Sequence, residues 1–127
     1  MADKQTIYTI REDEDRGSVR VSEEVLAIIA GLAATEVKGV ASMAGGMTND
    51  IIARLGMKNL RSGVSVVVED NEASVDLKLT ISYGYAIVDV SKEVQERVKT
   101  AIESMTGLTC RQVNVRVADV SVKENKE

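Results

Sequence analysis

The stretch SVDLKLTISYG, residues 74–84, decides the fold class of this 127-residue chain. Its apolar residues occupy every second position: Val75, Leu77, Leu79, Ile81 and Tyr83. Alternation with this period is typical of a strand that buries one face and exposes the other to water. We therefore expect a strand that ends at Gly84, with Tyr83 continuing its buried face.

Immediately after this strand, the spacing of the apolar residues becomes that of a helix. Between Val88 and Met105, one apolar stripe is formed by Val90, Val94, Val98, Ala101, Ile102 and Met105. The pairs Glu93–Arg97 and Lys99–Glu103 have the i,i+4 spacing of ion pairs on a wet helix face. Gly107 supplies the C-terminal stop.

A second long helix is predicted nearer the N-terminus. A short strand at 18–21 leads to Ser22, which has the properties of an N-cap, and Gly39 follows the helix. One expected apolar stripe consists of Val25, Ile28, Ile29, Leu32 and Ala33. A parallel stripe of small residues, Ala27, Gly31 and Ala34, would let another backbone approach closely.

The remaining segments complete an α+β pattern. We expect strands at 40–44 and 64–69, a short helix after Thr48, a turn at 70–72 and a last strand that starts at Cys110 and extends to Val122. The last strand shifts its apolar parity by one residue, which predicts a β-bulge near Ala118-Asp119. The predicted order is β-α-β-(short α)-β-β-α-β, a small, largely antiparallel sheet with two long helices packed on one face.

The chain has the length of one domain. Residues 1–16, which include the charge run REDEDR, are predicted to be a polar and flexible tail. Residues 17–122 are predicted to form the domain and residues 123–127 a solvated end. Strand 64–69 and the last strand are candidates for sheet edges, and unpaired edges would allow a homo-oligomer to form.

The composition excludes several kinds of enzyme. The chain contains no His and a single Cys, so one copy cannot build a Ser-His-Asp or Cys-His relay or a Cys/His zinc site. We expect no cofactor, no metal and no catalytic residues. A small-molecule sensor or carboxylate-based enzyme using Asp76, Asp89 or Glu103 stays open as the alternative.

The charge and the hydropathy of the chain indicate its cellular compartment and which classes of partner it favours. The formal net charge is −4 and the only aromatic residues are three tyrosines, so nucleic-acid binding ranks below the other functions. No apolar run is long enough for a membrane span, and a lone cysteine fits a reducing compartment. We therefore expect a cytoplasmic protein, with Cys110 as a buried or half-buried, inert thiol.

Two sets of residues are candidate contact sites. Arg54, Lys58 and Arg61 would share one face of a continuing helix and could contact an anionic partner or lipid headgroups. A solvated helix face is the simpler interpretation of this basic cluster. Tyr85, which lies beside the next helix, is a candidate interface residue because tyrosine is enriched at interface hot spots.

Three segments, taken together in order and spacing, resemble the alkaline shock protein family, also described as the Gls-type envelope stress response family. The segments are GSVRVSEEVLAIIAGLAATEVKGVASM at 17–43, RLGMKNLRSGVSVVVED at 54–70, and SVDLKLTISYGYAIVDVSKEVQERVKTAIESMTGLTCRQVNVRVADV at 74–120. The RLGMKN motif is most similar to the branch found beside fatty-acid-synthesis genes.

The resemblance implies a non-enzymatic protein of Gram-positive-type bacteria that acts in envelope stress or membrane-lipid homeostasis by binding other proteins. It implies two kinds of partner, a membrane-anchored protein and acetyl-CoA carboxylase subunits. The first would recruit the chain to the inner face of the membrane. The family brings no catalytic residues that map onto this sequence.

Overall fold

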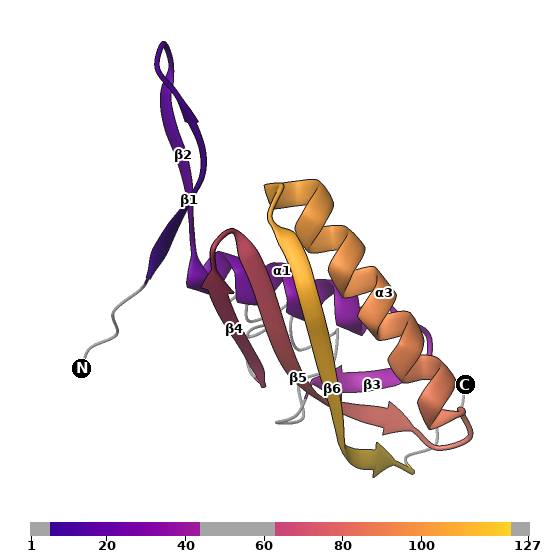
Figure 1. Ribbon diagram of the computed structural model, residues 1–127. Coiled ribbons are helices and arrows are strands. Elements are labelled where there is room, and N and C mark those ends of the chain that lie inside the picture. Colours follow the sequence, from indigo (N-terminus) through magenta and orange to yellow (C-terminus); the bar gives the residue numbers. More distant parts are fainter. Residues whose placement is uncertain (1–5, 44–62, 123–127) are drawn as a thin grey trace, which may run out of the picture.

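A computed structural model describes residues 6–43 and 63–122 and confirms the α+β class (Figure 1). The expected short helix after Thr48 lies outside the described residues. The elements are, in chain order, β1 (Ile7–Asp13), β2 (Gly17–Ser22), α1 (Glu23–Thr35), β3 (Val40–Met43), β4 (Val64–Glu69), β5 (Glu72–Ser82), α3 (Ile87–Thr106) and β6 (Thr109–Ser121).

Strand β5, which contains the decisive alternating stretch, is the central strand of the larger sheet. Strand β6 pairs with it in parallel along 72–82. Strands β4 and β3 pair antiparallel with different parts of β5, at 72–77 and 79–81, so they share its other edge. The parallel pair follows from the connection, because α3 carries the chain back across the sheet between β5 and β6.

Helices α1 and α3 pack on each other and on the same face of this sheet (Figure 1). The buried face of β5 consists of Ala73, Val75, Leu77, Leu79 and Ile81, each at most 1% exposed. The alternation therefore correctly identifies the centre of the core up to Ile81. The opposite face of the sheet is not covered by either helix.

Helix α1 begins as expected but buries a different face. The Ser22 hydroxyl accepts a hydrogen bond of 3.2 Å from the Val25 backbone N–H, which confirms the N-cap. The expected stripe that starts at Val25 is correct only in part, since Ala33 is buried and Ile29 packs against the core, but Val25 is 42% exposed. The buried positions are mainly small: Leu26, Ala27, Ala30, Gly31, Ala33, Ala34 and Thr35. The face of α1 that packs against α3 and the sheet therefore consists mainly of small side chains.

Helix α3 follows its predicted stripe at four-residue spacing. Its buried residues are Val90, Val94, Val98, Ile102 and Thr106. Met105 was expected on this stripe but is 67% exposed, because the packed ridge follows i, i+4 positions and passes through Thr106 instead. The two predicted ion pairs are present, with N···O distances of 3.5 Å for Arg97–Glu93 and 3.1 Å for Lys99–Glu103.

Two local backbone features match the sequence analysis. Asp70 and Asn71 have φ of 53° and 65°, which gives the two-residue turn between β4 and β5. In β6, Val117 is paired with Leu79 and Asp119 with Thr80. Ala118 is therefore the extra residue of a β-bulge, as predicted.

The N-terminal segment differs from the expected polar tail. The structure places Ile7–Asp13 in strand β1, which pairs antiparallel with β2 as a hairpin that protrudes from the body (Figure 1). Tyr8 and Ile10 pack against the core at its base, and the Glu23 backbone N–H donates to the Thr6 carbonyl at 2.7 Å. The charge run REDEDR forms the tip of the hairpin. Its polar composition is typical of a solvated tail, so the sequence pattern does not indicate the strand.

Candidate functional site

One end of the molecule carries a concentration of exposed apolar side chains. Strand β5 ends at Ser82 and α3 begins at Ile87. The Tyr83 backbone N–H donates a hydrogen bond of 2.9 Å to the carbonyl of Ser121 at the end of β6. The connection from β5 to α3 is thereby held beside the last residues of β6.

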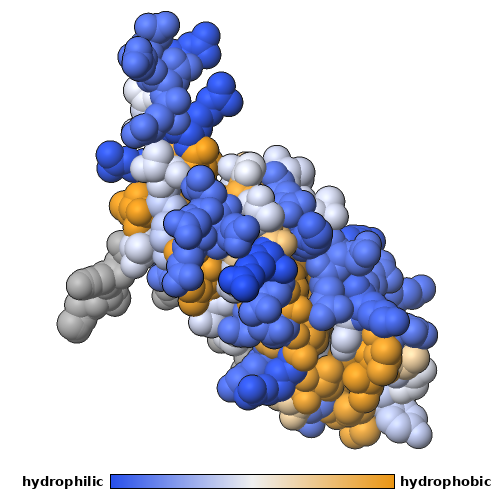
Figure 2. All heavy atoms as spheres, in the orientation of Figure 1, coloured by the Kyte–Doolittle hydropathy of each residue, from blue (hydrophilic) through white to orange (hydrophobic). Residues whose placement is uncertain are grey.

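The exposed residues from these three segments form what we call the apolar end surface. They are Tyr83, Tyr85, Ile87, Val88, Val120 and Val122. Val88 is 63% exposed and Val122 is 76% exposed. Figure 2 shows the corresponding hydrophobic area at the lower right, where the ends of β5 and β6 meet the start of α3. A contiguous apolar area of this kind is typical of an interaction surface.

Tyr83 was expected in the core, and this prediction is wrong. Its side chain is 76% exposed. The reason is that β5 ends one residue earlier, at Ser82, and Gly84 turns the chain with a φ of +101°. Strand parity no longer decides the direction of a side chain once the chain has left the sheet.

Tyr85 is half-exposed, and its ring lies against the turn between α1 and β3. A Cβ atom at Gly39 would come within 2.8 Å of Val90 Cγ2 and 2.9 Å of Tyr85 Cδ2. The ring is therefore packed on a position that only glycine can occupy, since Gly39 also has a φ of +102°. The interface role of Tyr85 stays a prediction, but the ring has a fixed support.

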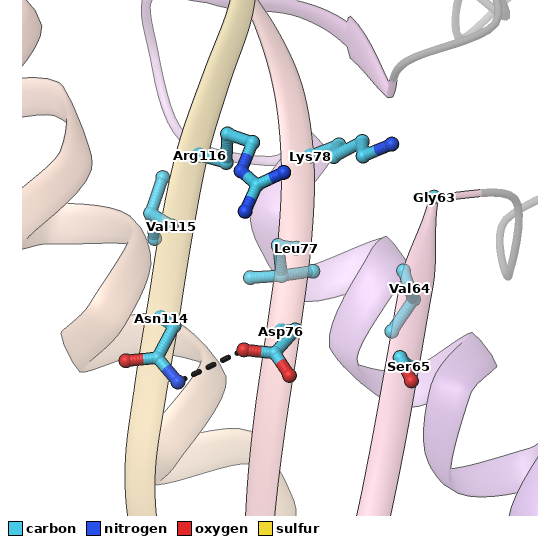
Figure 3. Close-up of a pocket in the computed structure, with 9 residues that line it drawn as sticks. All are labelled: Gly63, Val64, Ser65, Asp76, Leu77, Lys78, Asn114, Val115 and Arg116. Carbon is cyan, nitrogen blue, oxygen red and sulfur yellow. Dashed lines mark hydrogen bonds between the residues drawn. The ribbon is translucent and has the colours of Figure 1, made fainter.

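A second surface lies on the face of the sheet opposite to α1 and α3, which we call the open face because neither of these two helices covers it. We call it the polar hollow; it has a volume of about 570 Å³ and is lined by Gly63, Val64, Ser65, Asp76, Leu77, Lys78, Asn114, Val115 and Arg116. Figure 3 shows its polar side chains arranged across β4, β5 and β6. Asn114 Nδ2 donates a hydrogen bond of 2.9 Å to Asp76 Oδ1.

The carboxylates considered for catalysis are on different parts of the fold. Asp76 lies in the polar hollow, Asp89 in the first turn of α3, and Glu103 in the last turns of the same helix. Glu103 lies fourteen positions after Asp89 in the helix, a rise of about 21 Å. Asp76 is separated from Glu103 by the sheet, because α3 packs on its other face. Within residues 6–43 and 63–122, no group of three or more Cys, Asp or Glu side chains is arranged to hold a metal ion.

The single cysteine is placed as the sequence analysis expects. Cys110 is buried at the start of β6, and burial, followed by the nearby Glu103 carboxylate, raises the pKa of its thiol. The Cys110 backbone N–H in turn donates to Glu103 Oε2 at 2.8 Å. That hydrogen bond, followed by the one from Lys99, lowers the pKa of Glu103.

Local sequence patterns indicate only part of each surface. The alternation of the last strand accounts for Val120 and Val122 without a surface role, and Ile87 precedes the predicted helix. Lys78 and Arg116 each occupy a polar position in the alternating pattern of their own strand. Only the parallel register of β5 and β6 makes the two positions neighbours. The basic cluster of Arg54, Lys58 and Arg61 lies outside the described residues and stays a prediction.

Comparison with known proteins gives the family. The sequence model of the alkaline shock protein 23 family, described as having a cell envelope-related function, matches residues 11–122. The chain is 32% identical over 120 residues to the Bacillus subtilis protein YqhY, covering 94% of this chain and 89% of YqhY. It is 38% identical over 116 residues to the Streptococcus pyogenes protein Spy1614, covering 90% of this chain and 96% of Spy1614.

A more distant relative is named for a stress response. The chain is 29% identical over 113 residues to a stress response regulator gls24 homolog of Streptococcus pyogenes, covering 88% of this chain and 63% of that protein. No solved structure matches the chain significantly. No helix in the described part of the chain is long and apolar enough to cross a membrane. The family model spans β2 to β6 and every residue of both surfaces, and the chain therefore belongs to the alkaline shock protein 23 family of cell envelope-related proteins.

Proposed function

We propose that this chain is a non-catalytic interaction module that binds a partner protein through the apolar end surface. The observation that carries the proposal is the exposure of Tyr83, Val88 and Val122 at the end of the molecule where β5 and β6 end and α3 begins. Leaving such side chains in water costs about 25 cal/mol for each Å² of apolar area, so a partner that covers them gains affinity.

The geometry of Tyr85 also supports a docking role. Its ring rests on Gly39 and beside Val90, so part of its conformational freedom is already lost in the free protein. A side chain that is fixed before binding loses less entropy when the complex forms. Tyrosine combines a large apolar ring with a polar hydroxyl, which suits the rim of an interface.

The family context supports a setting at the cell envelope. The family is cell envelope-related, and a relative is named as a stress response regulator. We therefore propose a role in envelope stress or membrane-lipid homeostasis in the cytoplasm. The proposed partners are a membrane-anchored protein, which would recruit the chain to the inner face of the membrane, or a subunit of acetyl-CoA carboxylase.

Site-specific cross-linking tests this proposal in living cells. A photo-reactive amino acid is placed at Val88, on the apolar end surface, and in a second strain at Thr100, on the exposed face of α3. Mass spectrometry then identifies the adducts. We expect a membrane-anchored protein or a carboxylase subunit to be enriched at Val88 over Thr100. Equal adducts at both positions, or none at Val88, would contradict the proposal.

A matched pair of variants separates docking from folding. Val88→Asp introduces a charge on the apolar end surface, and Val67→Asp introduces the same charge on β4, where Val67 is 52% exposed on the open sheet face. Both variants should keep the circular dichroism spectrum of the wild type. Val88→Asp should lose the adduct formed by a photo-reactive residue at Ile87, and Val67→Asp should retain it.

A further inference from the structure

The polar hollow carries two cations on neighbouring strands, and neither of them has a partner within the described residues. Lys78 on β5 and Arg116 on β6 are paired in register. Neither side chain makes a hydrogen bond or an ion pair with another described residue. Like charges directly opposite each other in a sheet are unfavourable, and a bound anion would remove that repulsion.

The space beside these cations follows from the residue on the neighbouring strand. The Lys78 backbone N–H donates to the Gly63 carbonyl at 2.9 Å, which places Gly63 next to Lys78 in the sheet. Gly63 has no side chain, so this position adds no side-chain atoms next to Lys78. Figure 3 shows the Arg116 guanidinium lying over the sheet between β6 and β5, with Lys78 extending toward the Gly63 side.

The next row of residues adds polar groups of a different kind. Ser65, Asp76 and Asn114 are aligned across the three strands. Asn114 holds Asp76 through Oδ1, and Asp76 Oδ2 has no hydrogen-bond partner within the described residues. The second carboxylate oxygen is therefore available to accept a hydrogen bond from a hydroxyl group, and Ser65 can donate one.

We propose that the polar hollow binds a polyol phosphate, that is, a phosphoryl group with a hydroxyl group on a neighbouring carbon. Lys78 and Arg116 bind the phosphoryl oxygens, and Asp76 accepts a hydrogen bond from the hydroxyl. Two adjacent cations match the charge of a phosphoryl group better than that of one carboxylate, and the guanidinium fork suits phosphate oxygens. Asp76 would repel a bare anion, so the site should favour ligands that carry the hydroxyl.

This chemistry has two sources in a cell, a free polyol phosphate and the glycerol phosphate headgroup of an anionic phospholipid. Both present phosphate oxygens with a hydroxyl group on a neighbouring carbon, as a monoester with a charge near −2 in the free form and as a diester with a charge of about −1 in the headgroup. The inference goes beyond the docking function, because it concerns the open face of the sheet and uses no residue of the apolar end surface. Its tests are therefore separate from those of the docking proposal.

Solution titrations test the free form of the ligand. Backbone amide NMR spectra of the whole chain are recorded with sn-glycerol 3-phosphate, inorganic phosphate and glycerol at low salt. We expect sn-glycerol 3-phosphate to bind in the millimolar range and to shift the amide signals of Lys78 and Arg116. Glycerol should not bind. The double variant Lys78→Gln/Arg116→Gln should weaken binding by about tenfold or more, which corresponds to about 1.4 kcal/mol.

Two further variants test the assignment of roles. Lys92→Gln/Arg97→Gln removes the same two charges from α3, where both side chains line a different surface, and should change affinity less than twofold. Asp76→Asn removes the carboxylate that repels a bare anion. It should strengthen the binding of inorganic phosphate and abolish the preference for sn-glycerol 3-phosphate.

Flotation with vesicles tests the lipid form. Vesicles containing phosphatidylglycerol are compared with vesicles of phosphatidylcholine alone, using the wild type and the same double variants. Binding to phosphatidylglycerol that is lost in Lys78→Gln/Arg116→Gln and kept in Lys92→Gln/Arg97→Gln identifies the headgroup as the source. Binding of sn-glycerol 3-phosphate alone identifies the free form. Absence of both, or equal loss in the two double variants, overturns the inference.

Discussion

The backbone N–H of Cys110 donates a hydrogen bond of 2.8 Å to the Glu103 carboxylate, which joins the end of α3 to the start of β6. The same oxygen, Oε2, accepts from Lys99 Nζ at 3.1 Å. One carboxylate therefore connects the crossover helix to the strand that follows it. Its charge should matter more to stability than that of other exposed carboxylates on α3.

Glu103→Gln tests this connection through pH. Because the pKa of Glu103 is lowered in the folded state, ionisation stabilises the fold above the unfolded pKa of about 4.3. That contribution is lost as the pH falls through the folded pKa. Glu103→Gln should therefore be less stable than the wild type at neutral pH and equally stable in acid, as measured by urea unfolding at both pH values.

The matched control for Glu103 is Glu96→Gln. It removes the same charge from an exposed carboxylate of α3 that makes no hydrogen bond within the described residues. Its urea midpoint should remain close to that of the wild type at both pH values. A similar loss in the two variants would show that net charge, and not the Cys110 hydrogen bond, is responsible.

The Cys110 thiol should react slowly in the folded protein. The side chain is buried, and its raised pKa reduces the fraction of reactive thiolate. Labelling by a disulfide reagent at mildly alkaline pH should be about a hundredfold slower than in the urea-unfolded chain. In Cys110→Ala/Val122→Cys, the exposed thiol should react at the unfolded rate. Equal rates in the folded wild type and this variant would show that the thiol is accessible.

Gly39→Ala should destabilise the protein by about 2–4 kcal/mol, from backbone strain and overpacking together. The new Cβ would meet Val90 Cγ2 at 2.8 Å and Tyr85 Cδ2 at 2.9 Å. Gly84→Ala is the matched control, because Gly84 has a similar φ of +101° and no atom within 4 Å of its Cβ position. Thermal unfolding should show a clearly greater loss for Gly39→Ala, and equal losses would exclude the close contact as a cause.

The turn between β4 and β5 should depend on the residue at 71. Asn71 has a φ of 65°, which asparagine and glycine tolerate better than other residues. Asn71→Ala should cost about 1–2 kcal/mol of unfolding free energy, and Asn71→Gly should remain within about 0.5 kcal/mol of the wild type. The measurement is urea unfolding, and equal losses for both variants would point to the Asn71 side chain instead of its φ.

Local sequence signals predict much of the fold. Each of three signals predicts one local feature of the backbone. The features are the strand around Leu77, the helix N-cap at Ser22 and the β-bulge at Ala118. The orientation of α1 is different, because it depends on which helix packs against it. Both of its stripes are apolar, and only the packing against α3 and the sheet selects the small residues over Val25.

The two surfaces required information that is not local. Tyr83 continues the strand period in the sequence, yet the strand ends one residue before it. Lys78 and Arg116 are 38 residues apart, and the side-by-side placement depends on the parallel register of β5 and β6. A parity pattern assigns each side chain to a face but says nothing about its neighbour across the strands.

The central position of β5 has a consequence for how the protein is made. During synthesis, β5 emerges from the ribosome with β3 and β4 already available for one of its edges. Its other edge stays unpaired until residues 109–121 have followed. The apolar face around Leu79 therefore stays uncovered by α3, and β5 stays unpaired with β6, until these two later segments have been translated. We expect completion of the core to be a late step on the ribosome, and a nascent chain halted before β6 to be a substrate for chaperones.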